Sequence, residues 1–176
     1  MAAQRSAKLD KARGGGRLMS ARLITLVTQI RRTAALTYRR ELGLSEVDWR
    51  VLSQIGEHAP LSLNALAEII GLDRGQLSRG VTRLVAAGLA TRTARRGGPG
   101  ILIGLSPAGE DLFVRLMALA LERNAAFTRG IGAQELATFS AVLDKMTANA
   151  RVLLESEQAK TRERGRAAAD LAAAQA

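Results

Sequence analysis

Arginine is the residue type that offers this sequence the most chemistry, and it is concentrated between residues 73 and 96. That stretch has six arginines against one aspartate, a net charge of +5. A guanidinium donates hydrogen bonds in a rigid fork that fits phosphate oxygens and the major-groove edge of guanine. The residues expected to contact a nucleic acid are Arg74, Gln76, Ser78, Arg79, Thr82, Arg83, Arg92, Arg95 and Arg96. A solvated basic face on an ordinary helical domain is the alternative.

Catalytic chemistry has little support in the sequence. The 176 residues include one histidine and no cysteine, which nearly excludes nucleophile–base pairs and excludes thiolate metal sites. His58 is expected at a helix C-terminus, where an imidazole usually interacts with unpaired carbonyl groups. The acidic pair Glu110–Asp111 is explained by its place in the first turn of a helix. We therefore expect no enzyme, no metal site and no cofactor.

The overall charge also indicates a polyanionic partner. The formal net charge is +10 and the sequence pI is about 11.4, and nucleic acid is the commonest partner of such proteins. A membrane surface is the rival, but the arginines gather in one segment rather than along a continuous amphipathic helix. No apolar run approaches the span of a bilayer, and residues 1–17 lack the apolar core of a signal peptide. We expect a cytoplasmic protein.

The apolar periodicity around the arginines predicts two short helices joined by a tight turn. Between residues 62 and 70 the apolar side chains recur at i, i+3, i+4 and i+7, and Gly71 ends this helix. Asp73 and Gln76 have the spacing of a capping box for a second helix. Its expected buried stripe is Leu77, Val81, Leu84 and Val85. The arginines are then left on the outer face, where they can meet base edges and phosphates.

A short hairpin is expected to follow the second helix. Residues 89–95 alternate weakly, residues 97–100 are glycines and a proline that favour a turn, and residues 101–103 are β-branched or apolar. Ser106 and Pro107 then have the pattern of an N-cap and first position of a helix. The predicted fold class is mainly α with a small β-hairpin wing, that is, a winged helix-turn-helix with a helical dimerisation region.

Longer apolar helices are expected on both sides of this unit. One spans about 18–42 and is apolar on more than one face, and the next begins at Ser45 and ends before Ala59–Pro60. After the hairpin, one helix continues to about Phe127 and a last one begins near Ala133. The last helix has an apolar seam at spacings of 3 and 4, formed by Leu136, Phe139, Leu143, Met146, Ala150 and Leu153. Such helices at both ends are most simply buried against a second copy of the chain.

The chain is therefore expected to have three parts. These are a mobile basic arm (1–17), one domain (18–154) and a charged alanine-rich tail (155–176). Within the domain, residues 45–109 are expected to form a DNA-binding lobe, and residues 18–42 and 110–154 the dimerisation helices. The basic arm of residues 1–17 can enter a DNA minor groove. The alternative is that these residues are disordered and have no specific role.

The order of these elements and three local strings resemble the MarR family of bacterial transcriptional regulators. The strings are LSEVDWRVLSQIGEHAPLS, LAEIIGLDRGQLSRGVTRLVAAGLATR and LIGLSPAGEDL, and the resemblance covers roughly Met19 to Leu154. It implies an obligate dimer, with the helix that opens at Asp73 in the major groove and the hairpin tip in the minor groove. The family's contacts from this helix fall on Arg74, Gln76, Ser78, Arg79 and Arg83.

One departure from the family pattern concerns the wing. The place of the usual Asp-x-Arg signature is taken by Gly97-Gly98-Pro99-Gly100. The arginine that contacts DNA from the wing must then be Arg95 or Arg96, or the wing contact is weaker and less specific.

The resemblance also implies a small-molecule effector. Members of the family commonly bind aromatic acids or phenols, or coenzyme A thioesters of the acids, between the dimer helices and the DNA-binding lobe. Residues of this chain that would line such a cleft are Arg31, Arg32, Tyr38, Trp49 and Arg50. The arginines suit a carboxylate and the rings suit an aromatic group. Ordinary surface or interface residues are the alternative for each position.

Two functions from different classes fit this sequence. The first is a dimeric, ligand-responsive transcriptional regulator, a repressor released from a palindromic operator by an aromatic carboxylate or phenol. The second is a constitutive DNA-architectural protein without a ligand, and a shift of melting temperature with aromatic acids would separate the two. An RNA-binding winged helix has less support, because residues 61–109 contain no Phe, Tyr or Trp on which bases would stack.

Overall fold

The computed structural model describes residues 18–95 and 99–174, with side chains described as far as residue 166. The expected basic arm (1–17), Arg96 and the turn glycines 97 and 98 lie outside the described residues. The chain divides into two compact units, Met1–Ala126 and Phe127–Ala176. Within the described residues, no helix is both long enough and apolar enough to cross a membrane.

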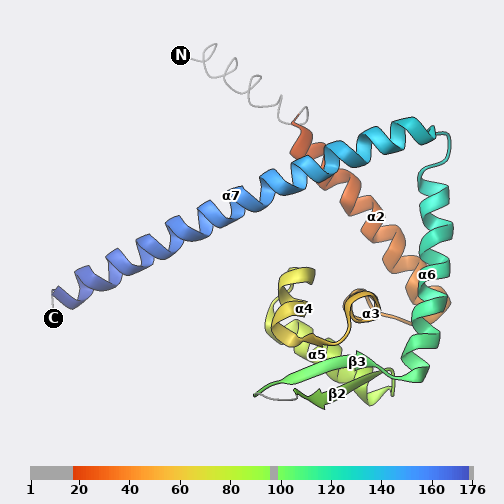
Figure 1. Cartoon of the computed structure of the whole chain (residues 1–176), viewed down its shortest axis with the longest axis horizontal. Coiled ribbons are helices and arrows are strands. Elements are labelled where there is room, and N and C mark those ends of the chain that lie inside the picture. Colours follow the sequence, from red (N-terminus) through yellow and green to blue (C-terminus); the bar gives the residue numbers. More distant parts are fainter. Residues whose placement is uncertain (1–17, 96–98, 175–176) are drawn as a thin grey trace, which may run out of the picture. The chain divides into compact units, whose positions relative to one another are not determined.

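Five helices form most of the first unit (Figure 1). They are α2 (Met19–Leu42), α3 (Glu46–His58), α4 (Leu63–Ile70), α5 (Arg74–Ala86) and α6 (Pro107–Phe127). Ser45, Ser62 and Asp73 cap α3, α4 and α5, because each side chain accepts a hydrogen bond from the backbone N–H three residues later. The helix boundaries predicted from the sequence are therefore confirmed within about two residues.

The wing belongs to a three-stranded antiparallel sheet with strand order β1-β3-β2. Strands β2 (Ala90–Ala94) and β3 (Ile101–Leu105) form the expected hairpin, with Ala90 opposite Leu105. The sheet also has a third strand that was not predicted from the sequence, because β1 (Leu61–Ser62) pairs with the other side of β3. A strand of two residues has no alternation that a sequence could reveal. It anchors the wing to the start of α4.

The core of the first unit is centred on α3. Val51, Leu52 and Ile55 of this helix are fully buried. Helix α3 contacts α2, α4, α5 and β3, so each of these elements is positioned by the same apolar face. From α5, the core receives Leu77, Val81 and Leu84, three of the four residues of the expected stripe, whereas Val85 is only half-buried.

Two glycines of the first unit allow helices to approach closely. A Cβ atom placed on Gly56 of α3 would lie 2.4 Å from the Phe113 ring of α6. A Cβ placed on Gly80 of α5 would lie 2.7 Å from Cγ1 of Val47 on α3. Real Cβ atoms do not tolerate such distances, so both helix crossings depend on glycine.

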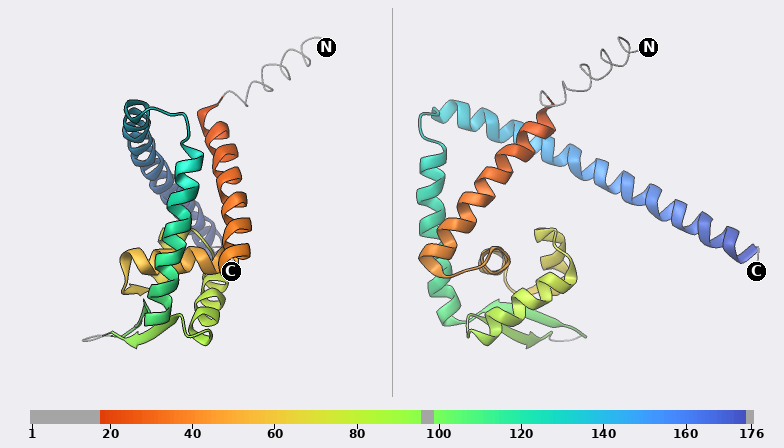
Figure 2. Two further views of the ribbon diagram at one scale, coloured as in Figure 1. Left: turned by 90° about the vertical axis from the view of Figure 1, so that its right-hand side faces the viewer. Right: turned by 180° about the vertical axis from the view of Figure 1, so that it is seen from behind.

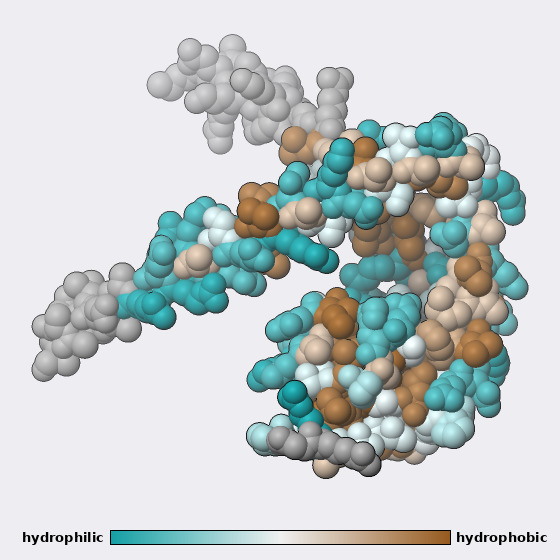
Figure 3. Space-filling model, in the orientation of Figure 1, coloured by the Kyte–Doolittle hydropathy of each residue, from teal (hydrophilic) through white to brown (hydrophobic). Residues whose placement is uncertain are grey.

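The second unit consists mainly of α7 (Ala133–Ala174), a helix of 42 residues. It extends through residues 155–174, which the sequence analysis set apart as a tail. The apolar seam faces solvent in the single chain, where Phe139 is 50% and Leu143 is 40% exposed. Apolar residues are visible as brown patches along this helix in Figure 3.

Replacing Gly56 by alanine tests the close contact between α3 and α6. We expect Gly56→Ala to lower the free energy of unfolding by about 1 to 3 kcal/mol, because the new methyl group overlaps the Phe113 ring. Urea denaturation followed by fluorescence of the single tryptophan, which lies on α3, measures this change.

The matched control is Gly165→Ala on α7, where a Cβ meets nothing within 4 Å. This substitution should leave the unfolding of the first unit unchanged. A Gly56→Ala protein as stable as wild type would show that the α3–α6 crossing relaxes freely.

Candidate nucleic-acid interface

Helix α5 presents the polar face that the sequence predicted. Its buried side is apolar, and its other side exposes Arg74, Gln76, Arg79, Thr82 and Arg83, while Ser78 is half-buried. Because Asp73 caps the N-terminus through Oδ1, 2.9 Å from the backbone nitrogen of Gln76, the first turn of this face is well defined. The structure therefore gathers the expected contact residues of α5 on one accessible surface.

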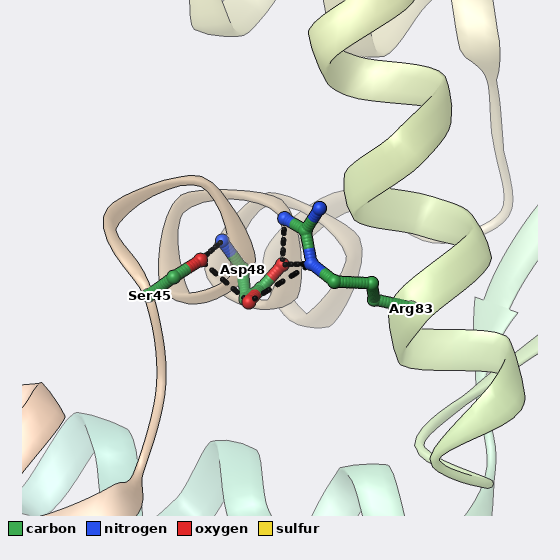
Figure 4. Close-up of polar contacts among 3 residues, drawn as sticks. All are labelled: Ser45, Asp48 and Arg83. Atoms are coloured by element: carbon green, nitrogen blue, oxygen red, sulfur yellow. Dashed lines mark hydrogen bonds and ion pairs between the residues drawn. The ribbon is translucent and has the colours of Figure 1, made fainter.

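Arg83 is held by a carboxylate on α3 (Figure 4). Its Nη2 lies 2.6 Å from Oδ1 of Asp48, and its Nε lies 3.1 Å from the same oxygen and 3.4 Å from Oδ2. Arg83 is one of the residues expected from the sequence to contact a nucleic acid. No local pattern indicates this pairing, because Asp48 and Arg83 are 35 positions apart.

Asp48 is itself fixed by the cap of α3. Ser45 Oγ accepts a hydrogen bond from the backbone N–H of Asp48 at 3.3 Å and donates one to Oδ2 at 2.5 Å. The Asp48 side chain is 13% exposed, whereas the Arg83 side chain is 51% exposed. The carboxylate is thus the fixed, mostly buried partner, and the remaining edge of the guanidinium faces solvent.

Two further arginines of the surface are tied to neighbouring elements. Arg74 Nη2 donates to Oδ1 of Asn64 on α4 at 2.6 Å. Arg92 Nη2, on strand β2, donates to Oγ1 of Thr82 on α5 at 2.8 Å, which links the wing to the helix. Arg79 differs from both, because it makes no hydrogen bond or ion pair with any residue that the structure describes.

Of the expected wing residues, Arg92 and Arg95 can be placed. Arg95 is exposed, and its backbone N–H donates to the carbonyl of Gly100 at 3.0 Å, which closes the described part of the turn. Arg95 lines one surface pocket together with the exposed Pro99 and Gly100. A cationic side chain is therefore available near the wing tip even though the usual acidic–basic signature is replaced.

The five residues expected to line an effector cleft do not form one cluster. Arg31 and Arg32 line a surface pocket of about 520 Å³ between α2 and the start of α3, together with Thr28, Ala35, Leu36 and Glu46. Glu46 accepts hydrogen bonds from the Arg31 guanidinium in this pocket, one of them from Nε at 3.1 Å. Two of the five residues therefore share a cavity.

The two aromatic residues lie apart from that pocket's lining. Tyr38 is 3% exposed, and its ring centroid lies 5.1 Å from that of Trp49. The Tyr38 hydroxyl accepts a hydrogen bond from Arg123 Nη1 at 3.1 Å. The Trp49 indole N–H is buried without an acceptor among the described residues. This pair is part of the core of the first unit in the single chain.

Arg50 points to the end of α4 rather than to the pocket. Its Nη2 donates to the carbonyl of Ile70 at 2.5 Å. Burial lowers the pKa of Arg50, the positive charge of Arg31 lowers it further, and Glu46 partly opposes both. Arg50 thus satisfies a helix C-terminus and is not a free carboxylate ligand in this conformation.

Arg123, which was not singled out from the sequence, links α6 to α2. Its Nη2 donates to the carbonyl of Ile30 and to Oγ1 of Thr33, each at 3.0 Å, and its guanidinium carbon lies 5.2 Å from the Tyr38 ring centre. The two helices run beside each other at this point (Figure 2). An arginine on an amphipathic helix gives no local signal of such a role.

Comparison with known proteins places this architecture. A family model described as "MarR family" matches residues 42–98, which contain α3, α4, α5 and β2. Over these residues the chain is similar to the MarR family, and its fold is the winged helix-turn-helix of solved MarR-family structures. This similarity indicates a DNA-binding transcriptional regulator. Comparison with curated proteins gives no match.

Solved structures of the MarR family share the fold. A regulator from Silicibacter pomeroyi is 26% identical, with a TM-score of 0.68 over 78% of this chain and 94% of that one. A MarR/EmrR-family regulator from Acinetobacter sp. ADP1 is 20% identical, with a TM-score of 0.70 over 77% and 96%. A putative MarR-family regulator from Listeria monocytogenes, solved with a 26mer DNA, is 19% identical, with a TM-score of 0.69 over 75% and 88%.

Arg79 is the residue on the polar face of α5 whose replacement should be most informative. We expect Arg79→Ala to weaken binding to a DNA duplex selected with the wild-type protein by about 1 to 3 kcal/mol, because an unpaired guanidinium is free to read a guanine. Fluorescence anisotropy with the selected duplex and a scrambled one measures the loss.

Arg115→Ala is the matched control, since Arg115 is an exposed arginine on α6. It should bind both duplexes as wild type does. Equal binding of the selected duplex by Arg79→Ala and by wild type would contradict the docking of α5 on DNA.

Proposed function

We propose that this protein is a dimeric, ligand-responsive repressor that leaves a palindromic operator when a small aromatic carboxylate or phenol, or a coenzyme A thioester of the acid, binds. The observation that supports it is the pocket of Arg31 and Arg32, because Glu46 joins that pocket to the same turn of α3 that holds Arg83. One turn of one helix therefore contacts both a candidate anion site and the candidate DNA-reading helix.

In this proposal α5 enters the major groove. Arg79, Arg83, Arg74 and the polar side chains Gln76, Ser78 and Thr82 would contact bases and phosphates, and Arg92, Arg95 and Arg96 would contact the flanking backbone or minor groove. Base contacts provide specificity, and phosphate contacts provide position and much of the affinity. The capped N-terminus of α5 gives this face a defined orientation.

The dimer in this proposal is supported by apolar surface that a single chain leaves in water. On α2, Met19, Ile24 and Leu36 are exposed, and on α7 the seam is exposed. Monomeric proteins rarely leave so many large apolar side chains uncovered on their longest helices. A two-fold dimer would present two copies of α5 to half-sites about 34 to 36 Å apart, one turn of DNA.

The pocket of Arg31 and Arg32 suits a planar carboxylate. The two guanidinium groups can hold the carboxylate, and Ala35 and Leu36 give it an apolar wall. Arg31 is already paired with Glu46 in the free protein, so a ligand carboxylate must displace the Glu46 carboxylate. That exchange would release the first turn of α3 on the side of α2 and loosen its hold on Arg83.

Calorimetry tests the ligand response. We expect a benzoate, hydroxybenzoate or hydroxycinnamate, or one of their coenzyme A thioesters, to bind more tightly without the selected duplex than with it. A ten- to hundredfold release from DNA corresponds to about 1.4 to 2.8 kcal/mol of coupling, and the DNA must weaken the ligand by the same factor. Glu46→Gln should tighten carboxylate binding, because it removes the competing anion.

The control for Glu46→Gln is Glu57→Gln, which removes the same charge from the exposed end of α3. It should bind the ligand as wild type does. If no compound binds, or if binding leaves the DNA affinity unchanged, the ligand response is refuted and a constitutive DNA-binding protein remains.

The dimer is tested separately by placing a charge in the seam of α7. We expect Leu143→Asp to produce monomers or aggregates in light scattering and to lose binding to the selected two-half-site duplex. Ala148→Asp adds the same charge to the opposite side of the helix and should remain dimeric. A Leu143→Asp protein that is dimeric and binds DNA normally would place the interface elsewhere.

A further inference from the structure

We propose that Asp48 determines DNA specificity by withholding Arg83 from indiscriminate phosphate contacts. Asp48 is then a positioning residue that acts on DNA through Arg83. This inference rests on the proposed function, in which α5 faces DNA. It goes further because it assigns a role in recognition to an acidic residue of α3, a helix outside the expected DNA-contact surface.

The geometry of the pair leaves Arg83 only one end of its guanidinium with which to bind DNA. Asp48 accepts from Nε and Nη2, so the inner edge of the guanidinium is used. Ser45 holds the carboxylate from the other side, and Asp48 is mostly buried, so the acceptor cannot follow a moving guanidinium. What remains is Nη1 and one N–H of Nη2, at the outer end of the side chain. An acceptor on DNA must lie at that end to be bound.

The net charge of the Asp48–Arg83 pair also favours this role for Asp48. A guanidinium bound to a carboxylate forms a locally neutral unit, and non-specific binding to DNA depends on cations that neutralise phosphates. Arg79 has no partner among the described residues and remains a free cation beside this pair. Arg83 therefore adds little to the attraction for any DNA, and it contributes only where the DNA presents an acceptor in the right place.

A purely structural role is the competing explanation, since Asp48 also belongs to the cap of α3. In that case its replacement would lower stability and weaken binding to every duplex alike. The proposal predicts the opposite sign for non-specific DNA. The two explanations therefore predict opposite changes in the affinity for non-specific DNA, and a loss of stability cannot increase that affinity.

The test compares Asp48→Asn with wild type on the selected and the scrambled duplex over a range of salt concentrations. The amide still accepts from Ser45 but has no charge. We expect tighter binding to the scrambled duplex and a slope of log K against log salt that is steeper by about 0.9, the value of one phosphate contact. The preference for the selected duplex should fall by about two- to fivefold, the range for one exposed ion-pair partner.

Two controls isolate the pair. Glu57→Gln removes the same charge elsewhere on α3 and should change neither the slope nor the preference. The double variant Asp48→Asn with Arg83→Gln keeps the net charge and allows two amides to hydrogen-bond. It should bind the scrambled duplex with the wild-type slope and bind the selected duplex more weakly. It also remains informative if Asp48→Asn alone fails to fold.

The outcomes separate this inference from the proposed function. Unchanged or weaker binding of the scrambled duplex by folded Asp48→Asn overturns the inference. A shallower slope for the double variant than for wild type also overturns the inference. It would mean that Arg83 of the wild-type protein contacts a phosphate even while it is paired with Asp48. If Arg79→Ala also has no effect, the docking of α5 on DNA fails as well; if Arg79→Ala weakens binding, only the role of Asp48 is refuted.

Discussion

The buried face of α3 is the constraint on which the rest of the first unit depends. Its apolar side chains Val51, Leu52 and Ile55 are fully buried. The helix contacts α2, α4, α5 and β3. Where α5 points is thus decided by how α3 packs beneath it, and Gly80 sets how close the two helices come. Because cores are densely packed, a displacement of α3 cannot be absorbed without moving the polar face of α5.

The polar contacts of α3 have a different role from its apolar ones. Its first turn carries Glu46, paired with Arg31 of α2, and Asp48, paired with Arg83 of α5. Partly exposed ion pairs contribute only about 0.2 to 1 kcal/mol, so they add little to the stability of the fold. Their effect is to orient long cationic side chains, and both of those side chains belong to proposed binding surfaces. A short helical turn is therefore where the proposed ligand response and the proposed DNA recognition meet.

The wing is fixed within the first unit, whereas the second unit leaves apolar surface exposed. Strand β1 and the Arg92–Thr82 hydrogen bond attach the wing to α4 and α5, so the hairpin is held beside the polar face of α5. Helix α7, by contrast, leaves its apolar seam in water. A partner helix would remove that surface from solvent, and the free energy of apolar burial is the main reason to expect one. The proposed two-site recognition of DNA would follow from the same association.

The sequence by itself determined the local features of this protein. The caps at Ser45, Ser62 and Asp73, the period of the apolar residues and the turn glycines depend on neighbours within a few positions, and the helices and the hairpin follow from them. They were enough to indicate a winged helix-turn-helix and the surface of α5. This part of the resemblance to the MarR family depends on no distant contacts.

Only the tertiary structure decided which polar side chains are free. Arg83 and Arg79 look alike in the sequence, yet one meets a carboxylate 35 positions away and the other meets no partner among the described residues. Arg50 and Tyr38 were expected to line a cleft. In the structure, Arg50 donates a hydrogen bond to the Ile70 carbonyl, and Tyr38 packs in the core. The physical reason is that helical periodicity reports which face of an element is apolar, whereas the partner of a long polar side chain depends on how separate elements pack.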